Sequence, residues 1–160
     1  MKKQRTKELQ TVDIEGGKYT LTVERVKYLA EEFSYSIETN AEFIESLNGW
    51  KVKAVLTIIE KDEFGNVEIL NYSGHGFEVI GSTEINSTNA LENAETSAVG
   101  RACGNAGIGL TDSFASADEM NGAKEKTKQI AVQKRIRASK TAEEKTLEKL
   151  TSKAVKNGSK

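Results

Sequence analysis

Residues 89–110 read NALENAETSAVGRACGNAGIGL, and this stretch decides the fold of the chain. It begins at Asn89 with Glu92 three residues later, a pattern typical of the first turn of a helix. It ends with Gly107 and Gly109, which suit a helix stop and a tight reversal of the chain. The stretch therefore predicts one helix with defined ends.

The interior of this predicted helix is poor in bulky side chains. Ala, Gly, Ser and Cys fill several of its faces, and one cation, Arg101, stands in the middle. Gly100 and Gly104 each cost a helix about 1 kcal/mol relative to alanine. We therefore expect a compensating close approach of the helix backbone to a sheet, to a neighbouring subunit or to a phosphate chain.

A second helix is predicted near the start of the chain. Apolar residues recur there at helical spacing, at Val23, Val26, Leu29, Ala30 and Phe33. Thr20 or Thr22 can supply its N-cap. The preceding segment, residues 1–18, has Gly16 and Gly17 near its end and is predicted to be a flexible leader.

Alternation of apolar and polar side chains predicts three strands, over residues 35–43, 50–59 and 67–80. In the middle strand one face is expected to be buried, with Trp50, Val52, Ala54, Leu56 and Ile58. A charged turn over residues 61–66 contains the pair Gly65–Asn66, which suits a hairpin. Gly74 and Gly76 in the third strand predict a bulge or a bend.

The order of elements predicts an α+β fold, in which the small-residue helix packs on an antiparallel three-stranded sheet. Ser116 with Glu119 predicts a further helix that starts near Ala117. Residues 19–120 then form the folded domain. Residues 121–160 are rich in lysine and thin in apolar residues, so we expect a basic C-terminal extension, helical or disordered.

Composition limits the class of protein. The 160 residues contain no apolar run near the ~20 residues of a membrane span and no apolar signal segment, so we expect a cytoplasmic protein. The lone cysteine, Cys103, excludes an internal disulfide and fits a small buried helix residue. The lone histidine, His75, falls in a predicted strand and is expected to be a sheet or surface residue. One Cys and one His do not make a structural zinc site.

The net charge of −1 conceals an asymmetry. Residues 1–120 carry 11 Lys and Arg against 20 Asp and Glu, a net charge of −9. Residues 121–160 carry 12 Lys and Arg against 4 Glu, a net charge of +8. A basic tail is a common device for binding nucleic acid or an acidic partner, and it is also common as a solubilising end.

Three segments resemble the Rad fifty-two-type single-strand annealing superfamily, above all its short phage and prophage members. The form ENAETSAVGRACGNAGIG is similar to the family's helix with a central basic residue and an Ala- and Gly-rich end. The form YTLTVERVKYLAEEF resembles its opening turn and helix, and residues 50–76 resemble its central hairpin. The resemblance covers residues 19–120.

The resemblance implies an ATP-independent protein of phage-type recombination and DNA repair. Many subunits would form a ring or helical filament that holds single-stranded DNA in a basic groove, with the bases presented for pairing. It implies no nucleotide cofactor, and the residues themselves lead us to expect no metal site. Its expected partners, besides DNA, are a phage exonuclease or a host replication protein in the bacterial cytoplasm.

The expected DNA-binding residues are cations that such an assembly would gather into one groove, namely Arg101, Lys51, Lys53, Arg25 and Lys27. Arg101 matches the basic residue of the family's groove helix. The position before it, often lysine in eukaryotic members, is Gly100 here. Lys51 and Lys53 match the strand region in which the family places phosphate contacts.

Each of these cations also has an ordinary structural interpretation. Arg101 can pair with a carboxylate such as Glu95 or with an acid of a neighbouring subunit. Lys51 and Lys53 can lie on a solvated strand face. The cations of the first helix, Arg25 and Lys27, can form surface ion pairs with its glutamates.

Three classes of function follow from the sequence. The first is a single-strand annealing protein, and the second is a protein that binds and protects single-stranded DNA without annealing it. The third is a protein–protein interaction or inhibitor protein on the same fold, which the acidic body keeps open. An enzyme is least expected, because the sequence has no Walker loop, no metal-binding carboxylate pair and no nucleophile elbow. An aromatic content of 6% disfavours a base-stacking platform, although Trp50, Tyr35 and Tyr72 could supply one.

Overall fold

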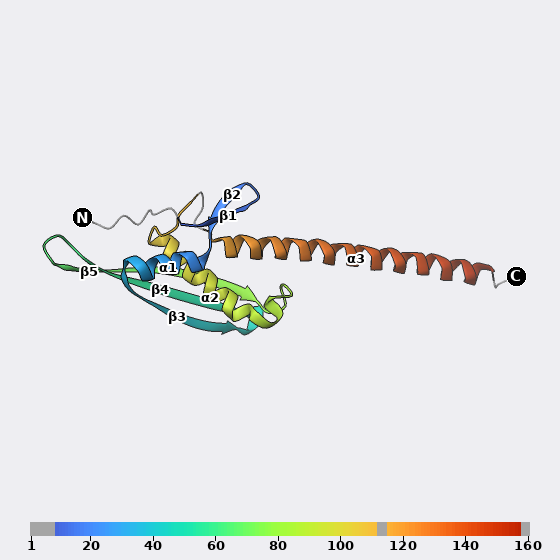
Figure 1. Ribbon diagram of the computed structural model, residues 1–160. Coiled ribbons are helices and arrows are strands. Elements are labelled where there is room, and N and C mark those ends of the chain that lie inside the picture. The colour runs from blue at the N-terminus through green and yellow to red at the C-terminus, as the bar shows by residue number, and fades with distance from the viewer. Residues whose placement is uncertain (1–8, 112–114, 158–160) are drawn as a thin grey trace. The chain divides into compact units, whose positions relative to one another are not determined.

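The computed structural model describes residues 9–111 and 115–157, and it confirms the α+β fold (Figure 1). The elements are β1 (Thr11–Ile14), β2 (Gly17–Thr20), α1 (Thr22–Glu32), β3 (Ser34–Ile44), a short 3-10 turn (Glu45–Leu47), β4 (Gly49–Lys61), β5 (Val67–Val79), α2 (Asn86–Asn105) and α3 (Ala117–Asn157). The chain divides into two compact units, residues 1–123 and 124–160. Each unit is described separately below.

The sheet of the first unit is antiparallel with the order β3-β4-β5, as predicted. Along β4 the residues Val52, Ala54, Leu56 and Ile58 are fully buried, and the residues between them face the other side. This alternation confirms the predicted buried face. The buried residues join Tyr28 and Leu29 of α1 and the alanines of α2 in one hydrophobic core.

Helix α2 packs directly on the sheet because two glycines of β5 leave room for its backbone. A side chain on Gly74 would collide with the backbone of Ala98 and Ala102, and one on Gly76 would collide with the carbonyl of Ala94. Both glycines continue the β4–β5 register without interruption. The predicted bulge is therefore wrong, and the glycines serve the close helix–sheet approach that the small-residue pattern predicted.

Helix α2 has an additional first turn ahead of the predicted start, and its main part follows Asn89, the predicted start, which is itself non-helical. The helix begins at Asn86, and the hydroxyl of Thr83 accepts a hydrogen bond from the Asn86 backbone N–H at 3.0 Å. Asn89 lies three residues inside, at a kink with non-helical φ −120° and ψ 29°. The C-terminal end is as predicted, because Gly107 and Gly109 both adopt positive φ just beyond the helix.

Helix α1 starts at Thr22, as expected within a residue or two, but neither predicted threonine caps it. Its N-cap is Leu21, which has no side-chain oxygen. The buried face consists of Thr22, Arg25, Tyr28 and Leu29, whereas Val23 is 53% exposed. The apolar spacing therefore predicted the helix correctly: Leu29 lies in the core, and Val26 and Phe33 pack against it.

Part of the segment predicted as a flexible leader is ordered. Strands β1 and β2 pair in an antiparallel hairpin in which Asp13 lies opposite Lys18. The turn uses Glu15 and Gly16, both with positive φ. The leader prediction is thus wrong for residues 11–18, and its remainder at residues 1–8 lies outside the described residues.

Helix α3 begins as predicted with a reciprocal capping box. The Ser116 backbone N–H donates to Glu119 Oε2 at 2.9 Å, and the Glu119 N–H donates to Ser116 Oγ at 3.3 Å. The helix continues through the second unit to Asn157, so of the two predicted states the helical one is observed. Its apolar residues Ile130, Val132 and Ile136 are each about half exposed.

The described helices contain no segment that is both long and apolar enough to cross a membrane.

Candidate nucleic-acid interface

The face of the sheet turned away from α2 carries two of the predicted site residues. We call it the open face and define it by nine outward residues in three neighbouring rows of β3, β4 and β5: Glu38, Asn40, Glu42, Lys51, Lys53, Val55, Ser73, His75 and Phe77. All of them are exposed to solvent except Val55, which is half-buried. Lys51 and Lys53 alternate with the buried Val52 and Ala54, which fixes both lysines on this face.

The two lysines have different neighbours across the sheet. Lys51 lies opposite Glu42 and Phe77, and its ammonium is 3.6 Å from the Glu42 carboxylate. Both partners of that ion pair are more than half exposed, so it contributes little to stability. Lys53 lies opposite Asn40 and His75, with no carboxylate in its row of the sheet. His75 is an exposed strand residue, as predicted.

Arg101 is a surface residue of α2 that pairs with an acid of its own chain. Its Nε donates to Glu119 Oε1 at 2.6 Å, and the Arg101 side chain remains 57% exposed. The Glu119 carboxylate therefore has two partners, because its other oxygen accepts a hydrogen bond from the Ser116 backbone N–H. Arg101 therefore forms an intrachain ion pair, as its ordinary structural interpretation predicted, but its partner is Glu119 instead of Glu95.

Arg25 is not available for DNA, which corrects the sequence prediction. Its side chain is fully buried, and its guanidinium donates to three backbone carbonyls, Gly100 at 2.6 Å, Gly109 at 3.3 Å and Ala115 at 3.5 Å. Burial lowers the pKa of Arg25, and the nearby Cys103 and acids of α3 oppose that shift. These hydrogen bonds connect α1 to the C-terminal part of α2 and to the loop that follows it.

Lys27 lies on the exposed side of the same helix. Its ammonium is 2.8 Å from the Glu24 carboxylate, one turn earlier. The hydrogen bond and the charge of Glu24 raise the pKa of Lys27. This is the surface ion pair that the glutamates of the helix predicted as the alternative to DNA contact.

The structure therefore brings together only two of the five predicted residues. Lys51 and Lys53 are neighbours on the open face, whereas Arg101 belongs to the helix that covers the opposite face of the sheet. A groove that includes both would have to be formed by more than one copy of the chain. The aromatics Trp50, Tyr35 and Tyr72, considered as stacking residues, pack against the core on the inner face.

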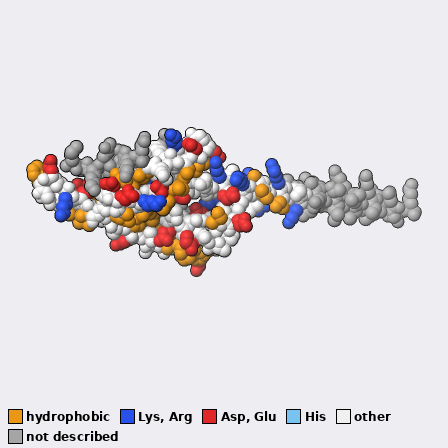
Figure 2. Space-filling view, viewed as in Figure 1, with side chains coloured by type: hydrophobic (Ala, Val, Ile, Leu, Met, Phe, Trp, Pro, Cys, Tyr) orange, Lys and Arg blue, Asp and Glu red, His pale blue; other side chains and the backbone are white. Residues whose placement is uncertain are grey.

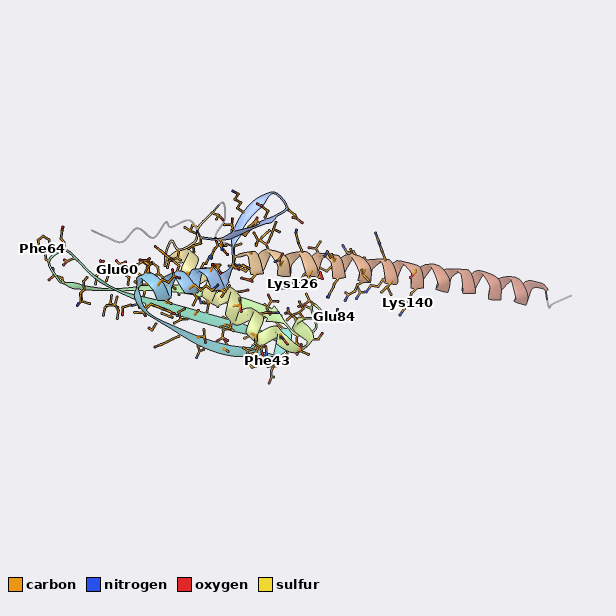
Figure 3. All side chains as sticks on the ribbon, in the orientation of Figure 1. Phe43, Glu60, Phe64, Glu84, Lys126 and Lys140 are labelled. Carbon is orange, nitrogen blue, oxygen red and sulfur yellow. The ribbon has the colours of Figure 1, made fainter. Side chains whose placement is uncertain are left out.

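The end of the β4–β5 hairpin is strongly acidic. A cavity of about 550 Å³ there is lined by Glu32, Phe33, Ser34, Ile59, Glu60, Lys61, Asp62, Glu63, Phe64 and Glu68. Figure 3 shows Phe64 at the tip of this hairpin and Phe43 at the opposite end of the sheet. The five carboxylates, with one lysine among them, repel phosphate groups, so this end of the sheet is unfavourable for a polyanion.

Cys103 is buried, as predicted, and burial raises its pKa to about 11, so the thiol stays protonated and inert at neutral pH. Within residues 9–111 and 115–157, no group of three or more His, Cys, Asp and Glu side chains could hold a metal ion.

Comparison with known proteins adds no assignment: no family model, no curated protein and no solved structure matches the chain.

Proposed function

We propose that the protein binds single-stranded DNA and anneals complementary strands without ATP. The observation that carries the proposal is the open face, where Lys51 and Lys53 stand side by side on a rigid sheet that α2 supports from behind. Adjacent outward residues of a strand are about 7 Å apart, so two ammonium groups can follow successive phosphates of an extended strand. Such a grip reads no sequence, which is what annealing of arbitrary strands requires.

Further cations support the same proposal. The described side chains of α3 in the second unit include seven basic residues, Lys124, Lys126, Lys128, Lys134, Arg135, Arg137 and Lys140 (Figure 2). Their charge attracts a polyanion that the acidic first unit repels. Arg101 is half exposed, and a phosphate can compete with Glu119 for its guanidinium.

The proposed protein works as an assembly. Lys51 and Lys53 lie on one face of the sheet and Arg101 belongs to the helix on the other, so a ring or filament of copies is needed to join them in one groove. The proposal includes a bacterial cytoplasmic setting, action in phage-type recombination and repair, and a phage exonuclease or host replication protein as partner. It includes no cofactor and no catalytic step.

The acidic hairpin favours a second candidate, a protein that binds or inhibits another protein. Five carboxylates around a cavity with an apolar wall suit a basic protein surface better than they suit DNA. In that case the basic helix would serve solubility, and the open face would bind no nucleic acid.

Two assays separate these candidates. Binding is measured by gel shift of a dT oligonucleotide at low salt, and annealing by the rate at which two complementary oligonucleotides pair. The proposal predicts binding and faster pairing. Binding with slower pairing would indicate a protection protein, and no binding at low salt would leave the interaction protein.

Arg101 is tested in the same assays. Arg101→Ala is expected to weaken binding and to reduce the slope of log affinity against log salt by about 0.7, the value for one phosphate contact to a single strand. Lys27→Ala is the matched control, because it also removes one paired surface cation. An unchanged slope in folded Arg101→Ala would exclude Arg101 from the groove.

A further inference from the structure

Phe77 is an exposed aromatic residue on the open face, and the sheet is shaped to hold its ring there. It is 40% exposed although it sits within the long strand β5. A side chain on Gly49, in the neighbouring strand, would come within 2.9 Å of Phe77 Cζ and 3.2 Å of Cε2. The glycine thus leaves space for the ring to lie over the backbone of β4.

The row of the sheet that holds Phe77 also holds Lys51 and its ion-pair partner Glu42. Phe77 lies directly opposite Lys51, and the next row of the same face pairs Lys53 with His75. The two rows are about 7 Å apart along the strands. An aromatic ring is therefore placed beside two ammonium groups at a spacing that an extended polyanion can follow.

The other exposed phenylalanines of the described chain have different surroundings. Phe64 is 83% exposed at the tip of the hairpin, among the acids of the cavity described above. Phe43 packs against Trp50 on the inner side of the sheet, with the ring centroids 5.1 Å apart and the rings tilted by 58°. Of these three rings, Phe77 is the one that shares the open face with Lys51 and Lys53.

We infer that Phe77 stacks on one base of a single strand that crosses the open face, while Lys51 and Lys53 contact the flanking phosphates. The inference rests on the proposed function and adds the residue that holds a base. Stacking on an aromatic ring is tolerant of sequence, because every base has a π-face. One stacked base per subunit fixes the strand and leaves the bases between subunits free to pair.

The first test compares two phenylalanine deletions in the full chain. Phe77→Ala is expected to reduce the affinity for a dT oligonucleotide on the order of tenfold, the usual effect of losing one base stack. Its salt slope is expected to stay at the wild-type value, because a ring releases no counterions. Phe64→Ala, the control, is expected to bind as the wild type does.

Two further variants separate stacking from folding. Phe77→Leu keeps the apolar contact with the sheet and is expected to bind as weakly as Phe77→Ala, while Phe77→Trp is expected to bind at least as tightly as the wild type. Circular dichroism and a thermal melt check the fold of each. Wild-type affinity in a folded Phe77→Leu variant would overturn the inference.

Photocrosslinking locates the base directly. A dT oligonucleotide with one 5-iododeoxyuridine, irradiated on the wild-type protein, is expected to crosslink to the peptide that contains Phe77. A crosslink confined to peptides of α2 or α3 would overturn the inference and leave the proposed function standing. No binding of the oligonucleotide at low salt would overturn both.

Discussion

The two units of the chain differ in what they are built from and in what they can contribute. Residues 1–123 carry the −9 charge and contain the whole hydrophobic core, whereas residues 124–160 carry the +8 charge and form a helix whose described apolar residues are half exposed. Hydrophobic packing therefore determines the structure of the first unit, whereas the distinguishing property of the second unit is its positive charge. The positive charge of the second unit attracts a polyanion. The negative charge of the first unit repels it, so it can bind there only where cations gather.

The comparison implies that changes in packing and changes in charge act on different properties. The first unit depends on close approach of backbones, on buried hydrogen bonds and on a neutral buried thiol. The described side chains of the second contribute nothing to the hydrophobic core, so substitutions among them are expected to alter affinity far more than the free energy of unfolding. Variants of each unit test this separation.

The largest effect is expected from Gly76→Val. The new side chain would collide with the Ala94 carbonyl, and α2 would have to leave the sheet. We expect a loss of about 4 kcal/mol or more in the free energy of unfolding, enough to abolish the cooperative transition. Chemical denaturation followed by circular dichroism measures it.

The control is Gly122→Ala in α3, where a Cβ meets nothing within 4 Å. Alanine is the better helix residue, so the variant is expected to be neutral or slightly stabilised. A native transition in Gly76→Val at the wild-type midpoint would show that α2 does not pack against β5 as described.

The second effect is expected from Arg25→Met. Methionine keeps the apolar volume but leaves the carbonyls of Gly100, Gly109 and Ala115 without their buried donor. We expect a loss of about 3 kcal/mol in the free energy of unfolding. Lys27→Met, two residues later and exposed, is expected to unfold close to the wild-type midpoint, because an exposed ion pair contributes little to stability. Equal melting of the two variants would mean that Arg25 is a surface residue after all.

A third effect depends on pH and comes from Cys103. Burial raises the pKa of the folded thiol to about 11, against 9.0 for the ordinary group. Below pH 9 both states keep the proton, and between about pH 9 and 11 the unfolded chain loses it first, so stability falls as pH rises. The loss is about 2 kcal/mol by pH 11.

The readout for Cys103 is the difference between the wild type and Cys103→Ala across that pH range, since other groups also titrate there. The wild type is expected to lose more stability than the variant. Parallel curves would show that the thiol is not buried in the folded chain.

The strands and the packing of α2 were predictable, because each has a local signal. Alternation along β4 indicates one buried face, and the run of Ala and Gly in α2 indicates that its backbone lies close to another element. The packing role of Gly76 could not be predicted, because a glycine within a strand indicates a bulge as readily as it indicates close packing by another element. Which of the two applies depends on a partner far away in sequence.

Arg25 shows most clearly why part of the site was mispredicted. It stands among glutamates on a short helix, which is the usual pattern of a surface cation, and its acceptors are backbone carbonyls 75 to 90 residues away. Every residue has a backbone carbonyl, so the sequence does not show which of them accept hydrogen bonds from Arg25. Phe77 was missed for a related reason, since only the pairing of β4 with β5 brings it beside Lys51.

The most direct test of the account is the salt dependence of dT oligonucleotide affinity in the wild type and in Lys51→Gln/Lys53→Gln. If both lysines contact phosphates from the open face, the slope of log affinity against log salt falls by about 1.4, twice the value for one single-strand contact. A folded double variant with the wild-type slope would contradict the account.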